Sequence, residues 1–115
     1  MSEIVIWHNP RCSKSRQTLQ LLQSRGVEPE IVEYLKYPPT KEEIKNALSM
    51  LDMKPRDLMR TGEAIYKETD LKNESDEDAL ISAMADYPIL IERPIVFSNE
   101  KAAIGRPPES VLQII

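Results

Sequence analysis

The sequence has one cysteine, one histidine and three glycines among its 115 residues. A single cysteine cannot form an internal disulfide, and one cysteine with one histidine supplies too few ligands for a zinc site. A redox cycle within the chain is therefore excluded, and any disulfide must be completed by a thiol from outside. Since a lone free thiol is typical of the reducing cytosol, we expect a cytoplasmic protein with no metal.

The chain also lacks basic character and long hydrophobic runs. Its formal net charge of -4 argues against nucleic acid as a partner. No stretch approaches the roughly 18 apolar residues of a membrane span, and the N-terminus has no signal-peptide pattern. With 41% hydrophobic and 30% charged residues, the composition predicts a globular protein, and the length predicts a single domain over 1–115.

Hydrophobic periodicity and turn residues predict the secondary structure. Short β-branched runs predict strands over 3–7, 30–34, 93–98 and 101–105, the last two forming a hairpin. A leucine face that ends at Gly26 predicts a helix beginning at or just after Cys12. The other helices are expected over 41–51 behind a Thr40-x-x-Glu43 capping box, 54–60, 63–68, 76–86 capped by Ser75, and 106–115 starting at Pro107 or Pro108. The acidic segment 69–78 is expected to be a solvated loop.

This order of elements predicts an α/β fold. A right-handed parallel βαβ unit followed by an antiparallel hairpin gives a mixed four-stranded sheet flanked by helices. That arrangement is thioredoxin-like, with a helical insertion between strands two and three, at about 40–87.

The segment HNPRCSKSR, residues 8–16, surrounds the only cysteine with basic residues and carries no acid. Cys12 falls at the start of the first helix, where unpaired N–H groups and the helix dipole favour a thiolate. Arg11, Lys14 and Arg16 are expected to add a positive field. A buried, inert cysteine would have apolar neighbours, so the pattern favours a reactive thiol.

Two further residues of this segment are candidates for the site. His8 is either a polar residue at the end of a strand or a charge partner of Cys12, and the sequence leaves both open. Ser15, one helical turn beyond Cys12, either faces water or donates a hydrogen bond to the sulfur. Ser15 also excludes a C-x-x-C redox pair, and Thr18 excludes the C-x5-R loop of thiol phosphatases.

Three arginines lie at the boundaries of predicted elements: Arg60, Arg93 and Arg106. In a thioredoxin-like fold the loop before the third strand faces the start of the first helix. This places Arg93 near Cys12 and makes Arg93–Pro94 a candidate cis bond. An arginine fork suits tetrahedral oxyanions, although spacing alone does not separate these three from the other arginines.

The motifs HNPRCSKSR, LKYPPT, LMRTGE, IERPIV and IGRPPE together resemble the glutaredoxin-linked arsenate reductases and their arsenate-reductase-like relatives. The resemblance covers essentially the whole chain and implies one arsenate-reductase domain. It implies that Cys12 is the nucleophile, that His8 influences its acidity and that Ser15 is the nearby hydroxyl. It also implies that Arg60, Arg93 and Arg106 bind the oxyanion.

By the same resemblance, the expected reaction is reduction of arsenate to arsenite. Glutathione is the expected co-substrate, glutaredoxin the protein partner, and no cofactor is bound. Two alternatives remain: a redox-responsive regulator of this fold that binds RNA polymerase, and a monothiol oxidoreductase without arsenate activity. The missing C-x-x-C disfavours the regulator, and three oxyanion-binding arginines would be surplus in the monothiol oxidoreductase.

Overall fold

The computed structural model describes residues 4–115, which form two compact units. The sheet unit contains the chain up to Tyr37 together with Arg93–Ile115, and the helical unit is Pro38–Glu92. No helix among the described residues is long and apolar enough to cross a membrane. The single domain expected over 1–115 stays a prediction.

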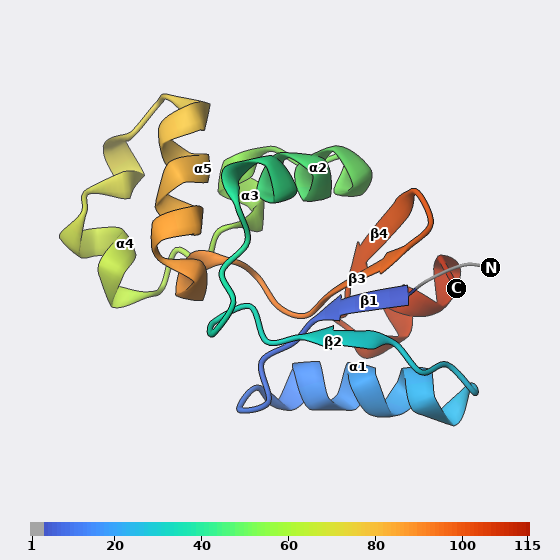
Figure 1. The fold of residues 1–115 in the computed structure, drawn as a ribbon. Helices are drawn as coiled ribbons and strands as arrows, with labels where there is room; N and C mark the ends of the chain where they lie inside the picture. Colours follow the sequence, from blue (N-terminus) through green and yellow to red (C-terminus); the bar gives the residue numbers. More distant parts are fainter. Residues whose placement is uncertain (1–3) are drawn as a thin grey trace. The chain divides into compact units, whose positions relative to one another are not determined.

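The sheet unit contains the four strands and two helices, α1 and the 3-10 helix η3 (Figure 1). Its elements are β1 (Ile4–Trp7), α1 (Ser13–Ser24), β2 (Glu30–Val32), β3 (Ile95–Ser98), β4 (Lys101–Ile104) and η3 (Pro108–Gln113). The strand order is β2-β1-β3-β4, with β1 parallel to β2 and antiparallel to β3. The predicted mixed four-stranded, thioredoxin-like sheet is confirmed; residue 3 of the first predicted strand lies outside the described residues.

Three elements of the sheet unit differ from the prediction. β3 begins at Ile95 rather than at 93, because Pro94 has no N–H to donate to a neighbouring strand. β2 ends at Val32 rather than at 34, because the chain turns at Glu33, whose carbonyl accepts from the N–H groups of Lys36 and Tyr37. The last helix is a 3-10 helix, with Pro108 in its first turn and i to i+3 bonds such as that from the Ser110 N–H to the Pro107 carbonyl. Both prolines lack an N–H, so the segment starts where the sequence predicted.

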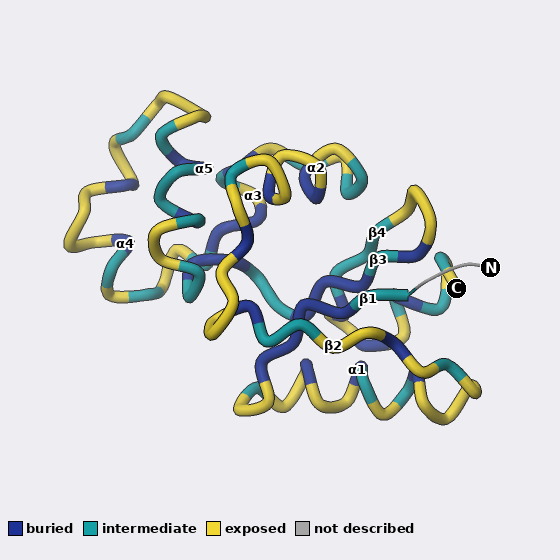
Figure 2. Tube along the Cα trace, viewed as in Figure 1, coloured by how far each residue is buried: buried dark blue, intermediate teal, exposed yellow. Residues whose placement is uncertain are grey.

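The core of the sheet unit lies between the sheet and α1 with η3, which pack against each other. Ile6 and Val96 project from paired positions of β1 and β3, and Leu22 and Val111 meet them from α1 and η3. All four side chains have no solvent exposure, and Figure 2 shows the second half of β1 and most of β3 in the dark blue of buried residues. This apolar layer holds α1 against the sheet, through residues in the C-terminal half of the helix.

The helical unit contains α2 (Lys41–Leu51), α3 (Pro55–Leu58), α4 (Ala64–Glu68), η1 (Leu71–Asn73), α5 (Glu77–Asp86) and η2 (Pro88–Leu90). The Thr40–Glu43 capping box is confirmed, with the Glu43 N–H donating to Thr40 Oγ1 at 3.1 Å and the Thr40 N–H to Glu43 Oε1 at 2.9 Å. Asp76, not Ser75, caps α5, since its carboxylate accepts from the N–H of Asp78. The segment predicted as a loop contains the single turn η1.

The pairing of the strands brings segments that are distant in the sequence to one end of the sheet. Trp7 at the end of β1 pairs with Ile95 at the start of β3, and Ile95 pairs with Ile104 at the end of β4. Three segments therefore leave the sheet at the same end of its strands: the loop after β1, the residues before β3 and the residues after β4. Because β2 is parallel to β1, the turn after Val32 lies there too.

Candidate active site around Cys12

Cys12 is the N-cap residue of α1, in an extended conformation with φ of -93° and ψ of 124°. Its N–H donates to the Asn9 carbonyl at 3.0 Å, and the N–H of Arg11 donates to Asn9 Oδ1 at 3.0 Å. Asn9 is buried, so it holds the loop in a tight turn from inside. The thiol itself is half-buried, and it lies where the first N–H groups of α1 are unpaired by the helix.

The environment of the thiol favours its ionised form. Partial burial is the largest single influence on the pKa of Cys12 and acts to raise it. The N–H of Ser15, the Arg93 guanidinium and the N–H of Lys14 act in the opposite direction, and together they hold the pKa of Cys12 below its ordinary value. A larger fraction of the thiol is therefore thiolate near neutral pH than in a free cysteine.

Arg93 and Arg106 reach the sulfur from the other end of the chain. Arg93 acts on Cys12 through a side-chain hydrogen bond and through its charge. Arg106 Nη2 lies 3.4 Å from Cys12 Sγ, and its Nε donates to the Arg93 carbonyl at 2.7 Å. The Arg93–Pro94 bond is cis, as predicted, and so is Arg106–Pro107, which the sequence analysis did not predict. The structure thus brings two of the three predicted arginines to the cysteine.

Gly105 explains how Arg106 comes so close to the N-terminal end of α1. A Cβ at this position would overlap Thr18 Oγ1 and lie 2.8 Å from Pro94 Cγ. Thr18 is fully buried, and its Oγ1 donates to the Lys14 carbonyl at 2.8 Å. Only a residue without a side chain allows β4 to end against α1 here, and sequence reasoning missed both Thr18 and Gly105.

The positive field expected from Arg11, Lys14 and Arg16 stays a prediction, and the structure describes a main-chain partner for one of the three. The N–H of Ser15, the Arg93 guanidinium and the N–H of Lys14 are the main groups that lower the pKa of Cys12. Arg16 Nη1 donates to the Pro10 carbonyl at 3.0 Å. Adjacency in sequence does not aim a long side chain at its neighbour, since side chains leave a helix in different directions.

His8 and Ser15 form a buried pair beside Cys12. His8 Nδ1 lies 2.7 Å from Ser15 Oγ, which also accepts from the N–H of Asn9 at 3.0 Å. Burial lowers the pKa of His8 and Arg16 adds to this, although Glu33 raises it. His8 is therefore mainly neutral at pH 7 and does not supply the positive charge considered from the sequence. Ser15 contacts the sulfur through its N–H, while its hydroxyl bonds to His8.

Arg60 belongs to the helical unit, where two carboxylates hold its guanidinium. Nε lies 3.1 Å from Glu63 Oε2, and Nη1 lies 2.8 Å from Glu92 Oε1. Burial lowers the pKa of Arg60, but Glu63 and Glu92 outweigh it and raise the pKa. The N–H of Arg60 also donates to the Leu90 carbonyl at 2.7 Å, so main chain and side chain are both anchored.

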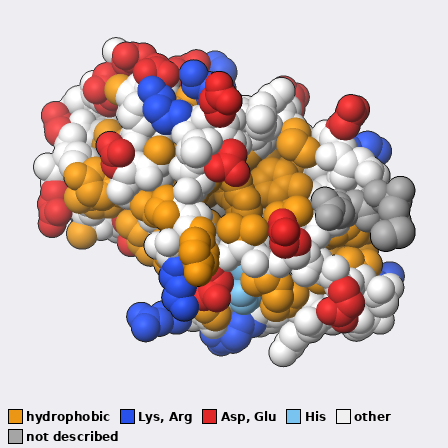
Figure 3. Space-filling view, viewed as in Figure 1, with side chains coloured by type: hydrophobic (Ala, Val, Ile, Leu, Met, Phe, Trp, Pro, Cys, Tyr) orange, Lys and Arg blue, Asp and Glu red, His pale blue; other side chains and the backbone are white. Residues whose placement is uncertain are grey.

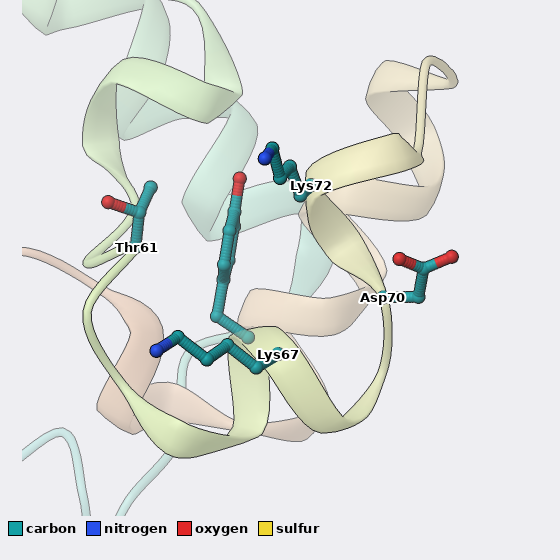
Figure 4. A pocket seen from close by; sticks show the side chains of 5 residues that line it. Thr61, Lys67, Asp70 and Lys72 are labelled. Atoms are coloured by element: carbon teal, nitrogen blue, oxygen red, sulfur yellow. The ribbon is translucent and has the colours of Figure 1, made fainter.

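The helical unit also has a hollow of about 540 Å³, lined by Thr61, Tyr66, Lys67, Asp70 and Lys72. Figure 4 shows Thr61 on one side of it and Asp70 and Lys72 on the other. None of the predicted site residues lines this hollow. Among residues 4–115 there is also no group of three or more His, Cys, Asp or Glu side chains that could hold a metal ion. This hollow therefore does not coincide with the site predicted around Cys12.

The fold and the site together define a thioredoxin-like protein with one activated cysteine at the start of its first helix. A family model described as "ArsC family" matches residues 7–114, and the chain belongs to this family. It is 54% identical to "Uncharacterized protein YfgD" of Escherichia coli (strain K12), over 98% of this chain and 97% of that protein.

Relatives named for an activity are nearly as similar. The chain is 49% identical to "Arsenate reductase" of Neisseria meningitidis serogroup A / serotype 4A (strain DSM 15465 / Z2491), over all of both chains. Among solved structures, "Arsenate reductase from Vibrio cholerae" superposes with a TM-score of 0.96 at 48% identity, covering 98% of each chain. The family and the whole-chain fold are thus supported by independent comparisons.

Proposed function

We propose that this chain reduces arsenate to arsenite, with Cys12 as the nucleophile and with glutathione and glutaredoxin as external reductants. The observation that carries the proposal is the half-buried Cys12 with its lowered pKa, contacted by the guanidinium groups of Arg93 and Arg106. A thiolate beside two forked cations suits attack on a tetrahedral oxyanion. Membership of the ArsC family and the names of the Neisseria and Vibrio relatives support the same substrate.

In this proposal Arg93 and Arg106 bind the arsenate oxygens and the N–H groups of α1 add to the positive potential. Arg60 is the third oxyanion-binding arginine by its motif, and it is the one already paired with Glu63 and Glu92. The neutral His8–Ser15 pair positions the loop so that the Ser15 N–H meets the sulfur. Guanidinium groups held in place before arsenate arrives stabilise the charge that gathers on its oxygens during attack.

The proposed chemistry balances over four steps. The Cys12 thiolate attacks arsenic, a sulfur–arsenic bond forms, and one oxygen leaves as water after taking up protons. Glutathione attacks the same arsenic and displaces a second oxygen as water. A glutaredoxin thiolate then attacks the glutathione sulfur; the glutathione–arsenic bond breaks, its electron pair reduces arsenic(V) to arsenic(III), and a mixed disulfide leaves. Water finally displaces Cys12 and releases arsenite.

The test is arsenite release by the purified chain with glutathione, glutaredoxin and arsenate. We expect turnover by the wild-type chain and a fall of about a thousandfold or more in Cys12→Ser, whose hydroxyl is a far weaker nucleophile. Serine differs from cysteine only in the reacting atom. The Cys12→Ser variant is therefore the matched control once it is shown to be folded. A wild-type rate no higher than that of Cys12→Ser would refute the proposal.

The two alternatives from the sequence give different outcomes in companion assays. Turnover of a glutathionylated peptide without any arsenate reduction would favour a monothiol oxidoreductase. Recovery of RNA polymerase subunits on the immobilised chain, together with no arsenate turnover, would favour a regulator. The expected cytoplasmic location stays a prediction and is checked by fractionation.

A further inference from the structure

We propose that a hollow on the loop that leads into Cys12, formed by residues 8–11 with Glu33, Leu35 and Lys36, is the site where glutathione docks before it attacks the arsenic. This inference rests on the proposed function and names the place of its second reactant. The hollow belongs entirely to the sheet unit and has a volume of about 330 Å³. That volume is at the lower end of the range of about 300–1,000 Å³ for small-molecule sites.

The hollow has two walls that the sheet holds together. One wall is the loop after β1, and the other is the turn after β2. Both segments follow the carboxyl ends of these two parallel strands. The N–H of His8 donates to the Val32 carbonyl at 2.8 Å and extends the pairing up to the rim. Crevices at the carboxyl ends of parallel strands are common ligand sites because loops converge there on a rigid base.

The loop wall is rigid before any ligand arrives. The Asn9 side chain and carbonyl accept from the N–H groups of Arg11 and Cys12, and Arg16 donates to the Pro10 carbonyl. A wall that is already ordered loses little conformational entropy on binding. Arg11 lines the hollow and directly precedes Cys12, so the hollow and the thiol belong to the same loop.

The charges of the hollow match those of glutathione. At neutral pH glutathione has a γ-glutamyl end with an ammonium and a carboxylate, a central thiol, and a glycyl end with a carboxylate alone. On one wall, Lys36 Nζ lies 3.6 Å from Glu33 Oε1. These opposite charges would meet the carboxylate and the ammonium of the γ-glutamyl end. Arg11 on the other wall is a lone cation for the glycyl carboxylate.

The surroundings of the hollow also suit an anionic tripeptide. With His8 mainly neutral, Arg11 and Lys36 outnumber Glu33, so the lining is net positive within an acidic protein. Leu35 is 39% exposed and offers an apolar surface for the aliphatic part of the peptide. Figure 3 shows blue Lys and Arg side chains near the pale blue histidine, the only one in the chain, together with a red acidic side chain. A positive potential there attracts glutathione to the thiol adduct.

The first experiment measures the KM for glutathione at saturating arsenate and glutaredoxin. We expect Arg11→Gln and Lys36→Gln each to raise it about threefold and the double variant about tenfold, with the KM for arsenate unchanged. Lys101→Gln is the matched control, because this exposed lysine starts β4 at the opposite end of the sheet unit. Equal glutathione KM values in the double variant and in Lys101→Gln would overturn the proposal. A raised KM for glutaredoxin in place of glutathione would also overturn it.

A second measurement assigns the orientation. Glutaryl-cysteinyl-glycine lacks only the ammonium of glutathione, so the wild-type chain should use it about threefold less well. We expect Glu33→Gln to lose this preference, because the ammonium then has no carboxylate to meet. A preference that persists undiminished in Glu33→Gln would contradict the assignment of the γ-glutamyl end.

Binding without chemistry separates this inference from the proposed function. S-methylglutathione cannot attack arsenic, and its addition to the wild-type chain should shift the amide resonances of residues 9–11 and 33–36. If these shifts occur in a chain that does not reduce arsenate, the docking site stands and the proposed function fails. If arsenate is reduced but the resonances do not move, the docking site fails and the function stands.

Discussion

Two arginines predicted for the same task have opposite surroundings in the two units. In the sheet unit, Arg106 directs one nitrogen at the Cys12 sulfur and another at a main-chain carbonyl. In the helical unit, Arg60 directs two nitrogens at the carboxylates of Glu63 and Glu92. One guanidinium thus contacts the reactive atom, while the other is part of a half-buried ion-pair network.

This difference shows what an arginine motif leaves undecided. The cation is the same in both cases, but the carboxylates around Arg60 compensate its charge and restrict its fork. Arg106 instead contacts the Cys12 sulfur and the Arg93 main-chain carbonyl, and neither of these contacts is with a carboxylate. The four predictions below test this comparison, beginning with the largest effect.

Arg93→Ala should have the largest effect, because Arg93 contributes both a hydrogen bond and a charge to the thiolate. We expect the pKa of Cys12 to rise, alkylation by iodoacetamide at pH 7 to slow, and arsenate kcat/KM to fall about a hundredfold with the fold retained. In Arg60→Ala the alkylation rate should stay at the wild-type value. The comparison breaks if both variants give the same pH profile of alkylation.

Gly105→Ala should come second, since it disturbs the packing that brings Arg106 to the sulfur. The new Cβ overlaps Thr18 and meets Pro94 at 2.8 Å, and overpacking of this kind costs about 2 kcal/mol of the free energy of unfolding. Urea denaturation measures the loss. The double variant Gly105→Ala/Thr18→Ala should recover part of it, and simple additivity of the two changes would contradict the proposed contact.

The third prediction contrasts the stability effects of the two arginines directly. Arg60→Ala leaves two half-buried carboxylates without the cation of Arg60. It should lower the free energy of unfolding by about 1–2 kcal/mol. Arg106→Ala removes an exposed side chain and should cost about 0.5 kcal/mol or less. Thermal melts followed by circular dichroism compare them. Equal losses would mean that the ion pairs of Arg60 are not what distinguishes the units.

The smallest effect should be the pH dependence that His8 adds to the sheet unit. Its pKa is lowered in the fold, so the unfolded chain takes up the proton first as the pH falls. The stability due to neutral His8 is present above its unfolded pKa of about 6.5 and is lost as the pH falls through the lower, folded pKa. Urea midpoints between pH 8 and pH 5 should decline less in His8→Gln. A wild-type slope in that variant would assign the decline to other groups.

Local patterns predicted much of the fold because short-range chemistry produced them. The capping box of Thr40 and Glu43 formed as expected, since both bonds lie within one turn. The start of α1 at Cys12 and the cis Arg93–Pro94 bond also agree with the prediction. The cap of α5 was wrong by one residue, because Asp76 and Ser75 are both good caps and only the path of the chain chooses between them.

The site was less predictable, because its contacts join residues far apart in the chain. Arg106 and Cys12 are 94 positions apart, and their contact depends on the sheet register and on the close approach of Gly105 to α1. The 330 Å³ hollow gave no sequence signal, since Glu33 and Lys36 are ordinary surface charges until the parallel strands place them beside residues 8–11. Motif resemblance, not spacing, singled out the arginines.

By itself, the sequence determined that one thiol is present and that any disulfide needs a partner from outside, because covalent chemistry depends only on which residues exist. It also determined the elements of the sheet and the place of Cys12 at a helix start. Only the tertiary structure brought Arg93 and Arg106, which lie more than 80 positions away in the chain, to the sulfur of Cys12. The physical reason is that electrostatic and hydrogen-bond energies depend on distance and direction in space. For residues far apart in the chain, only the fold fixes that distance and direction.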